Sequence, residues 1–171
     1  MPSPLLVVYC GLPGVGKSTV SRYTADQLGA SRHRSDEVRQ ELFEEPSYTP
    51  AELRATYEEL LERARADLEA GRDVVVDATF RERPERDRAA AVAEETGATV
   101  TFVRVTCSPE VVRERLQART DDPSDADLAV YREHRESFEP LVREHVTVDN
   151  SGSLAETRRQ VDQHVLDPLL E

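Results

Sequence analysis

The sequence predicts an α/β fold in which short strands form a parallel sheet flanked by longer helices. The first observation is that short β-branched runs alternate with longer helical patterns along the whole chain. The second is the length of 171 residues, which suits one domain with a substantial core and is too short for two domains of ordinary size. We therefore expect one folding unit over residues 1–171.

The expected strands are short runs rich in valine and threonine, separated by stretches with helical periodicity. Four such runs occupy residues 4–10, 73–77, 99–106 and 145–148. Residues 31–34 are a candidate for a fifth strand. Parallel neighbours need long crossover connections, and the helical stretches between these runs are long enough to supply them.

The expected helices have recognisable ends. Thr49 and Ser153 are each followed three residues later by glutamate, which is the capping-box pattern, and Ser108 precedes Pro109 as an N-cap with proline in the first helical position. Glycines at three positions lie where a helix should stop, namely Gly29, Gly71 and Gly97. The pattern of residues 49–70 predicts a long helical hairpin with an apolar stripe. The stripe either packs on the chain's own sheet or forms a dimer face, so the sequence is compatible with a monomer and with a homodimer.

The chain is strongly acidic, with 34 Asp and Glu against 22 Lys and Arg and a formal net charge of -12. Such a surface repels nucleic acids and anionic membranes, although high salt would weaken the repulsion if the acidity reflects an acidic, salt-adapted proteome. Nucleic acid is therefore a disfavoured but not an excluded partner. No run approaches the roughly 20 apolar residues that span a bilayer, and no signal-type segment precedes the first strand, so we expect a cytoplasmic protein without membrane contacts.

A glycine-rich segment follows the first expected strand. Residues 11–18 read Gly-Leu-Pro-Gly-Val-Gly-Lys-Ser, which is the eight-position P-loop or Walker A pattern, and an amphipathic stretch begins at Thr19. Glycines let the backbone N–H groups turn inward, and the following helix start adds its positive dipole end, so the segment favours a phosphate chain over a plain strand-to-helix turn.

The nucleotide is expected to be ATP, with GTP as an alternative, bound together with Mg²⁺. Lys17 would reach the β- and γ-phosphates, and the Ser18 hydroxyl would bind the metal. Lys17 is also the only lysine among 22 Lys and Arg side chains, as expected where a compact ammonium is needed rather than a planar guanidinium. The expected nucleotide-binding residues are Gly11, Pro13, Gly14, Val15, Gly16, Lys17, Ser18 and Thr19.

Two carboxylates are candidates for the rest of the site. Asp77 ends a strand and is placed to hold the water shell of Mg²⁺, although it could instead cap the next helix. With Ser35 as N-cap, Asp36 and Arg39 lie on nearly the same helix face and would supply a base and a cation for an acceptor hydroxyl. Spacing alone describes the second pair equally well as an ordinary helix start, where acidic residues are stabilising.

A pair of arginines is the candidate for charge stabilisation. Arg115 and Arg119 lie one turn apart on one helix face and could clamp a phosphoryl group, whereas spacing alone favours a solvated face with ion pairs. The polar segment from Thr120 to Asp125 reads as a mobile loop closing over the nucleotide. We therefore expect a short lid at approximately residues 115–126.

Five segments in order carry a family resemblance. They are GLPGVGKST at 11–19, SDEVRQEL at 35–42, VVVDATFRERPERDR at 74–88, SPEVVRERLQAR at 108–119 and DPSDADLAVYREHRESFEPL at 122–141. Together they resemble the P-loop kinases of the polynucleotide kinase and zeta-toxin type. The resemblance implies a five-stranded parallel sheet in the order 2-3-1-4-5, with the nucleotide base near the lid and near residues 149–152.

The resemblance also implies roles for particular residues. Asp36 would be the general base, and would touch the metal through water as Asp77 does, while Arg39 would hold the acceptor. Arg115 and Arg119 would belong to the lid and stabilise the transferring phosphoryl group. Additional acceptor or nucleotide contacts are expected from Thr79, Arg83 and Arg86.

The function expected is transfer of the ATP γ-phosphate to a hydroxyl group of a small molecule. One alternative is a polynucleotide or tRNA kinase acting on a 5′-hydroxyl or an aminoacyl group, for which Arg32, Arg34 and Arg39 would have to form the basic patch. The other alternative is a nucleotide-dependent switch or binding module that hydrolyses ATP slowly and acts through a partner.

Overall fold

The computed structural model describes residues 2–47, 49–119 and 125–170. Its centre is a five-stranded, all-parallel sheet in the order β2-β3-β1-β4-β5. The strands are β1 (Leu5–Cys10), β2 (Ser31–Arg34), β3 (Val74–Asp77), β4 (Thr99–Thr106) and β5 (Val146–Asp149). This confirms the predicted P-loop NTPase fold and its strand order, including the short strand expected at residues 31–34.

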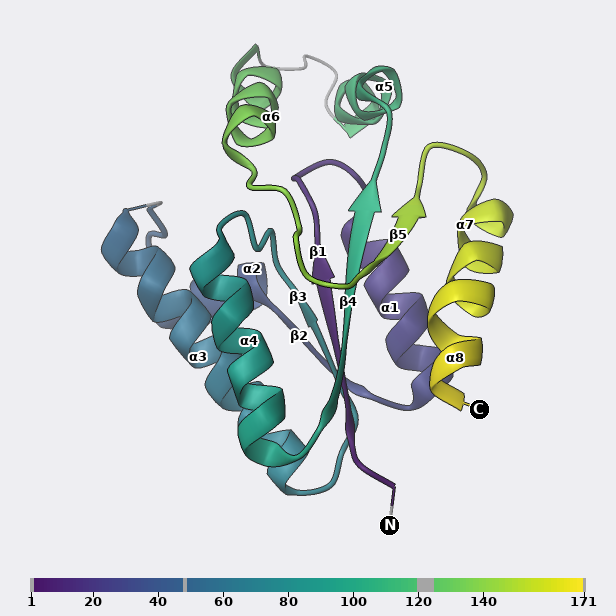
Figure 1. Ribbon diagram of the computed structural model, residues 1–171. Helices are drawn as coiled ribbons and strands as arrows, with labels where there is room; N and C mark the ends of the chain where they lie inside the picture. Colours follow the sequence, from purple (N-terminus) through teal and green to yellow (C-terminus); the bar gives the residue numbers. More distant parts are fainter. Residues whose placement is uncertain (1, 48, 120–124, 171) are drawn as a thin grey trace.

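Helices cover both faces of the sheet (Figure 1). Helices α3 and α4 pack on one face, α1 and α7 pack on the other, and α5 and α6 lie beyond the carboxyl ends of the strands. The helices are α1 (Lys17–Leu28), α2 (Ser35–Leu42), α3 (Pro50–Glu69), α4 (Arg83–Thr96), α5 (Pro109–Arg119), α6 (Asp125–Ser137), α7 (Leu154–Val161), the π-helical η1 (Asp162–Leu166) and α8 (Asp167–Leu170). Among these described residues, no helix is long and apolar enough to cross a membrane.

The central strands bury both of their faces because side chains alternate across a strand. In β1, Leu6 and Val8 point into a core shared with α3 and α4, whereas Val7 and Tyr9 point into a core shared with α1 and α7. All four side chains are fully buried. The near-continuous apolar runs in the sequence are therefore explained by burial on two sides rather than by a membrane or an interface.

The segment expected as a helical hairpin is a single helix. Helix α3 runs for 20 residues without a break, and its apolar stripe lies in the core of its own sheet, so the hairpin prediction was wrong. Thr49 caps this helix by accepting from Glu52 N at 3.3 Å, but the Glu52 carboxylate accepts from Ser47 N rather than closing the expected box. The box at Ser153 is complete on both sides.

Candidate functional site

The glycine-rich segment joins β1 to α1 at the carboxyl edge of the sheet. Gly14 and Gly16 have φ angles of 88° and 82°, a left-handed region that glycine enters without steric cost. Gly11 is required for space, because an added Cβ would lie 2.8 Å from the carbonyl oxygen of Val105 on β4. Helix α1 begins at Lys17, so its free N–H groups and positive dipole end lie at the loop. This arrangement suits a phosphate group.

Lys17 and Asp77 meet at this loop. Lys17 Nζ lies 3.6 Å from Asp77 Oδ1, and the two side chains are only 14% and 6% exposed. The strand register places Asp77 opposite Tyr9, next to the start of the loop. The other carboxylate oxygen of Asp77 accepts from Ser21 Oγ at 2.5 Å. Helix α4 starts at Arg83 with Glu82 as its N-cap, so Asp77 does not cap it.

Arg32 on β2 braces the first turn of α1. Its Nη1 donates to Ser18 O at 2.7 Å and to Ser21 Oγ at 3.2 Å, and burial lowers its pKa. Arg34 pairs with Glu37 at 3.3 Å, and Arg39 pairs with Asp36. The three arginines that an RNA-binding patch would need are therefore engaged with groups of the protein itself.

Asp36 and Arg39 form an ion pair at the start of α2. Arg39 Nη1 lies 3.1 Å from Asp36 Oδ1; the carboxylate-bearing side chain is 66% exposed, whereas the arginine side chain is only 9% exposed. The helix begins at Ser35 with Arg34 as its N-cap, one residue earlier than expected, so Ser35 lies inside the helix. The result is an accessible carboxylate held by a buried guanidinium.

The segment after β3 closes against the P-loop. Thr79 O accepts from Gly11 N at 3.2 Å, which ties the segment to the start of the loop. Phe80 has a φ angle of 47°, and its N–H donates to Tyr57 Oη at 3.0 Å. Burial raises the pKa of the Tyr57 hydroxyl far above its usual value, so this hydroxyl stays protonated.

The two arginines expected to contact the acceptor or the nucleotide, Arg83 and Arg86, differ sharply in solvent exposure. Arg83 is 67% exposed and lies 3.9 Å from Asp87 on its own helix. Arg86 is 2% exposed and donates four hydrogen bonds to backbone carbonyls, at 2.7 Å to Phe80, 3.0 Å to Arg81, 2.6 Å to Glu139 and 3.1 Å to Pro140. Arg86 therefore joins the segment after β3 to the segment after α6, and its guanidinium is occupied by the protein.

Arg115 lies against the P-loop from the side of α5. Its Nη1 is 3.4 Å from Val15 O and 3.5 Å from Cys107 Sγ, and its Nη2 donates to Asn150 O at 2.6 Å. The guanidinium therefore lies between the P-loop and the segment that follows β5. The side chain of Arg119 and residues 120–124 of the expected lid lie outside the described residues.

Asn150 is a site residue that sequence reasoning did not single out. Its Nδ2 donates to Val15 O at 2.8 Å, and its Oδ1 accepts from Thr157 Oγ1 at 2.7 Å. It also packs so closely on Gly16 that an added Cβ would collide with its amide. The available signal was its position directly after the last strand, at the edge where ligands bind in open parallel sheets.

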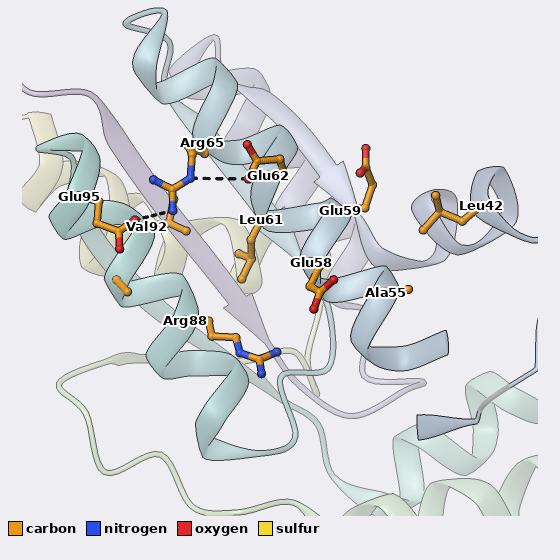
Figure 2. A pocket seen from close by; sticks show the side chains of 11 residues that line it. Leu42, Ala55, Glu58, Glu59, Leu61, Glu62, Arg65, Arg88, Val92 and Glu95 are labelled. Atoms are coloured by element: carbon orange, nitrogen blue, oxygen red, sulfur yellow. Dashed lines mark hydrogen bonds and ion pairs between the residues drawn. The ribbon is translucent and has the colours of Figure 1, made fainter. Parts of the chain in front are cut away.

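A pocket of ≈ 610 Å³ lies between α3 and α4, away from the P-loop (Figure 2). Arg65 bridges Glu62 and Glu95 on one side of it, and no residue of the P-loop lines it. Because neither the P-loop nor Asp77 lines it, it is not part of the candidate site.

The comparisons with known proteins agree with this geometry. A family model described as an AAA domain matches residues 6–141. An uncharacterized protein of Mycobacterium tuberculosis (strain ATCC 25618 / H37Rv) is 32% identical in an alignment over 133 residues that covers 71% of this chain. The match covers only 27% of that relative, so the chain spans about a quarter of its length.

Two solved structures have the same fold. A gluconokinase from Sinorhizobium meliloti 1021 superposes with a TM-score of 0.68 at 22% identity, covering 99% of this chain and 98% of that one. The Mycobacterium tuberculosis APS kinase CysC, in complex with AMPPNP and APS, superposes with a TM-score of 0.75 at 19% identity and full coverage of both chains.

Proposed function

The chain belongs to the AAA-domain family that its residues 6–141 match, and from this premise we propose that it is an ATP- and Mg²⁺-dependent phosphotransferase acting on a hydroxyl group of a small molecule. The observation that carries the proposal is the buried pair of Lys17 and Asp77, 3.6 Å apart at the N-terminus of α1. A cation, a carboxylate and free backbone N–H groups at one point are what phosphoryl transfer requires.

The nucleotide phosphates fit the P-loop. The backbone N–H groups between Gly14 and Ser18 and the ammonium of Lys17 would face the phosphate chain. Arg115 and Asn150 both contact the backbone carbonyl of Val15, and the remainder of the nucleotide would lie beside them. ATP is proposed over GTP because the fold is shared with a kinase whose structure holds AMPPNP.

The residues present also fit a magnesium ion. Ser18 supplies a hydroxyl and Asp77 a buried carboxylate, both oxygen ligands of the kind that Mg²⁺ prefers. Among the described residues, no group of three or more His, Cys, Asp or Glu side chains is placed to hold a metal ion. A magnesium ion bound here would therefore take most of its ligands from phosphates and water. When bound, the ion would supply charge neutralisation at the phosphates.

The acceptor is proposed to approach from the side of α2. The exposed Asp36 carboxylate would accept the proton of the attacking hydroxyl, and Arg39, buried beneath it, fixes the carboxylate through the 3.1 Å contact. Thr79, whose backbone is tied to Gly11, would line the same opening. Asp36 could also reach the metal through water.

A small molecule is favoured over a nucleic acid as acceptor. The net charge of -12 repels polyanions, and Arg32, Arg34 and Arg39 are engaged with groups of the protein itself. Gluconokinase and APS kinase, which share the fold, are named for small substrates. These observations together support the small-molecule reading.

The test is a screen of labelled γ-phosphate transfer from ATP and Mg²⁺ to sugars, sugar acids, nucleosides, nucleotide sugars and 5′-hydroxyl RNA. We expect a labelled small-molecule product with the wild-type protein and none with Lys17→Ala. Label found only on RNA would favour the polynucleotide alternative. Label released only to water, with every acceptor present, would favour a nucleotide-dependent switch.

A further inference from the structure

A small pocket of ≈ 140 Å³ lies beneath α6, next to the P-loop. Its walls come from the P-loop, from the carboxyl end of β4 with the start of α5, and from α6. Its lining includes Leu12, Val15, Arg104, Tyr131, Arg135 and Phe138. It is several times larger than the roughly 30 Å³ that a water molecule occupies, so a carboxylate or a phosphate group has room there.

Arg104 brings a positive charge into this pocket from the sheet. It stands on the face of β4 that points toward α6, it is half-buried, and its guanidinium lies 5.0 Å from the centre of the Phe138 ring. Stacking on a ring leaves the N–H groups around the edge of a guanidinium free to donate. The other cation on Phe138 is Arg86, at 4.9 Å, whose donors are already occupied by carbonyls.

Arg135 on α6 brings a second positive charge to the pocket. Tyr131 and Arg135 are four residues apart on α6, so helical geometry puts them on one face of the helix, and both line the pocket together with Phe138, which directly follows the helix. The ring of Phe138 and the side chain of Tyr131 are buried, whereas Arg135 is exposed. Two arginines thus line one small, partly apolar space.

Within the described part of the chain, no carboxylate pairs with Arg104 or Arg135 through an ion pair or a hydrogen bond, although the sequence has 34 Asp and Glu against 22 Lys and Arg. Arginines elsewhere find such partners readily, as Arg63, Arg65 and Arg143 do. A half-buried guanidinium without an anionic partner is costly, and a carboxylate or phosphate would satisfy it in a bidentate manner.

We propose that this pocket binds a carboxylate or phosphate group through Arg104 and Arg135, so that the acceptor of the phosphoryl transfer is an anionic hydroxyl compound. The statement about the acceptor rests on the proposed function, whereas the anion site does not. Leu12 and Val15 line the pocket and also belong to the P-loop, so an anion held here lies next to the phosphate site.

The anion site is tested by equilibrium dialysis with labelled inorganic phosphate and labelled glycerate. Lys17→Ala protein is used alongside wild type, because phosphate also suits the P-loop. We expect both probes to bind to Lys17→Ala, and Arg104→Gln or Arg135→Gln in that background to weaken binding about tenfold, the scale of one lost charge-assisted contact. Arg132→Gln, on the same helix but outside the pocket, should leave binding unchanged.

Binding that is absent, or that neither pocket variant reduces, would overturn the site, and so would an equal loss with Arg132→Gln. If Arg104→Gln does not fold, as judged by circular dichroism, Arg135→Gln decides, because that side chain is exposed. Unlabelled glycerol should not displace glycerate, since it lacks the carboxylate. Displacement by glycerol would also count against the site.

The statement about the acceptor is tested by turnover of matched pairs, glycerate against glycerol and gluconate against glucose. We expect the acids to have kcat/KM values at least about tenfold higher, and Arg104→Gln to remove that advantage. Equal turnover of acids and neutral compounds, with phosphate still bound in the pocket, would overturn the anionic acceptor and leave a separate anion site. No turnover of any acceptor, with binding intact, would overturn the proposed function alone.

Discussion

Replacing Arg86 with methionine tests whether one buried guanidinium holds the two segments beside the site together. The change keeps an unbranched side chain against Phe138 but removes four donors from the carbonyls of Phe80, Arg81, Glu139 and Pro140. Hydrogen bonds from a charged group contribute roughly 1.5–3 kcal/mol each, and a carbonyl left unpaired in the interior adds to the loss.

The expected loss is smaller than the sum of four such bonds. Only the bond to Phe80 is fully buried, and the other three carbonyls can recover water. We therefore expect Arg86→Met to lower the free energy of unfolding by about 3–5 kcal/mol, a large fraction of the roughly 5–15 kcal/mol of a typical domain.

Urea unfolding followed by circular dichroism measures this change. Arg88→Met is the matched control, because Arg88 is exposed on the same helix and should change the free energy by no more than about 0.5 kcal/mol. A loss below about 1 kcal/mol for Arg86→Met would refute the reasoning, because it would mean that the four hydrogen bonds stabilise nothing beyond what water supplies.

Three further predictions concern the P-loop and one ion pair. Asn150→Ala removes the hydrogen bond from Thr157 Oγ1, which keeps only its 3.2 Å contact with Ser153 O, and removes the amide bond to Val15 O. We therefore expect a stability loss of about 1–3 kcal/mol and weaker ATP binding by calorimetry; unchanged ATP affinity would show that Asn150 does not position the loop. Lys17→Ala should raise the Kd for ATP by at least about a hundredfold while the circular dichroism spectrum stays that of the wild type, and an unchanged Kd would remove Lys17 from the site. Burial alone would raise the pKa of Asp67, but hydrogen bonds from His33 and Arg72 outweigh it and lower the pKa. The stabilisation from this carboxylate is therefore present above its unfolded pKa of about 3.9 and is lost as the pH falls through the lowered value. Asp67→Asn should cost about 1–2 kcal/mol at pH 7 and progressively less as the pH falls below the unfolded pKa of about 3.9, and a pH-independent difference would contradict this assignment.

The fold follows from local features that the sequence displays openly. β-Branched runs became the strands, and the buried pattern of β1 and β3 explains why these runs are apolar throughout. The Walker A pattern located the loop and Lys17, because glycines are needed at the positions where the phosphate-binding loop has positive φ angles, such as Gly14 and Gly16. Asp77 was found because it ends a strand beside β1.

Two residues whose structural roles sequence reasoning did not predict act through partners far away in the chain. Asn150 was not singled out, and it binds the carbonyl of Val15, 135 positions earlier. Arg86 was expected to contact the acceptor or the nucleotide, but it binds Glu139 and Pro140, more than 50 positions later. Their partners are backbone carbonyls, which every residue carries, so no side-chain pattern marks them. The helical hairpin predicted at residues 49–70 was wrong because no helix-breaking residue follows Pro50 within this segment, and α3 continues to Glu69.

The central claim, that Asp36 serves transfer to a hydroxyl group, is tested most directly by the fate of the γ-phosphate. With an acceptor from the screen, labelled ATP and Mg²⁺, the rates of transfer to the acceptor and to water are measured for wild type, Asp36→Asn and Glu37→Gln. Glu37 is the control because it lies next to Asp36 in the first turn of α2 and pairs with Arg34 instead.

We expect Asp36→Asn to slow transfer to the acceptor by about 10²–10⁴-fold, the contribution typical of a general base, with ATP affinity unchanged and Glu37→Gln close to wild type. Transfer that is as fast in Asp36→Asn as in wild type would contradict the account. Equal losses in both variants would contradict it as well, because Asp36 would then act no differently from a neighbouring surface carboxylate.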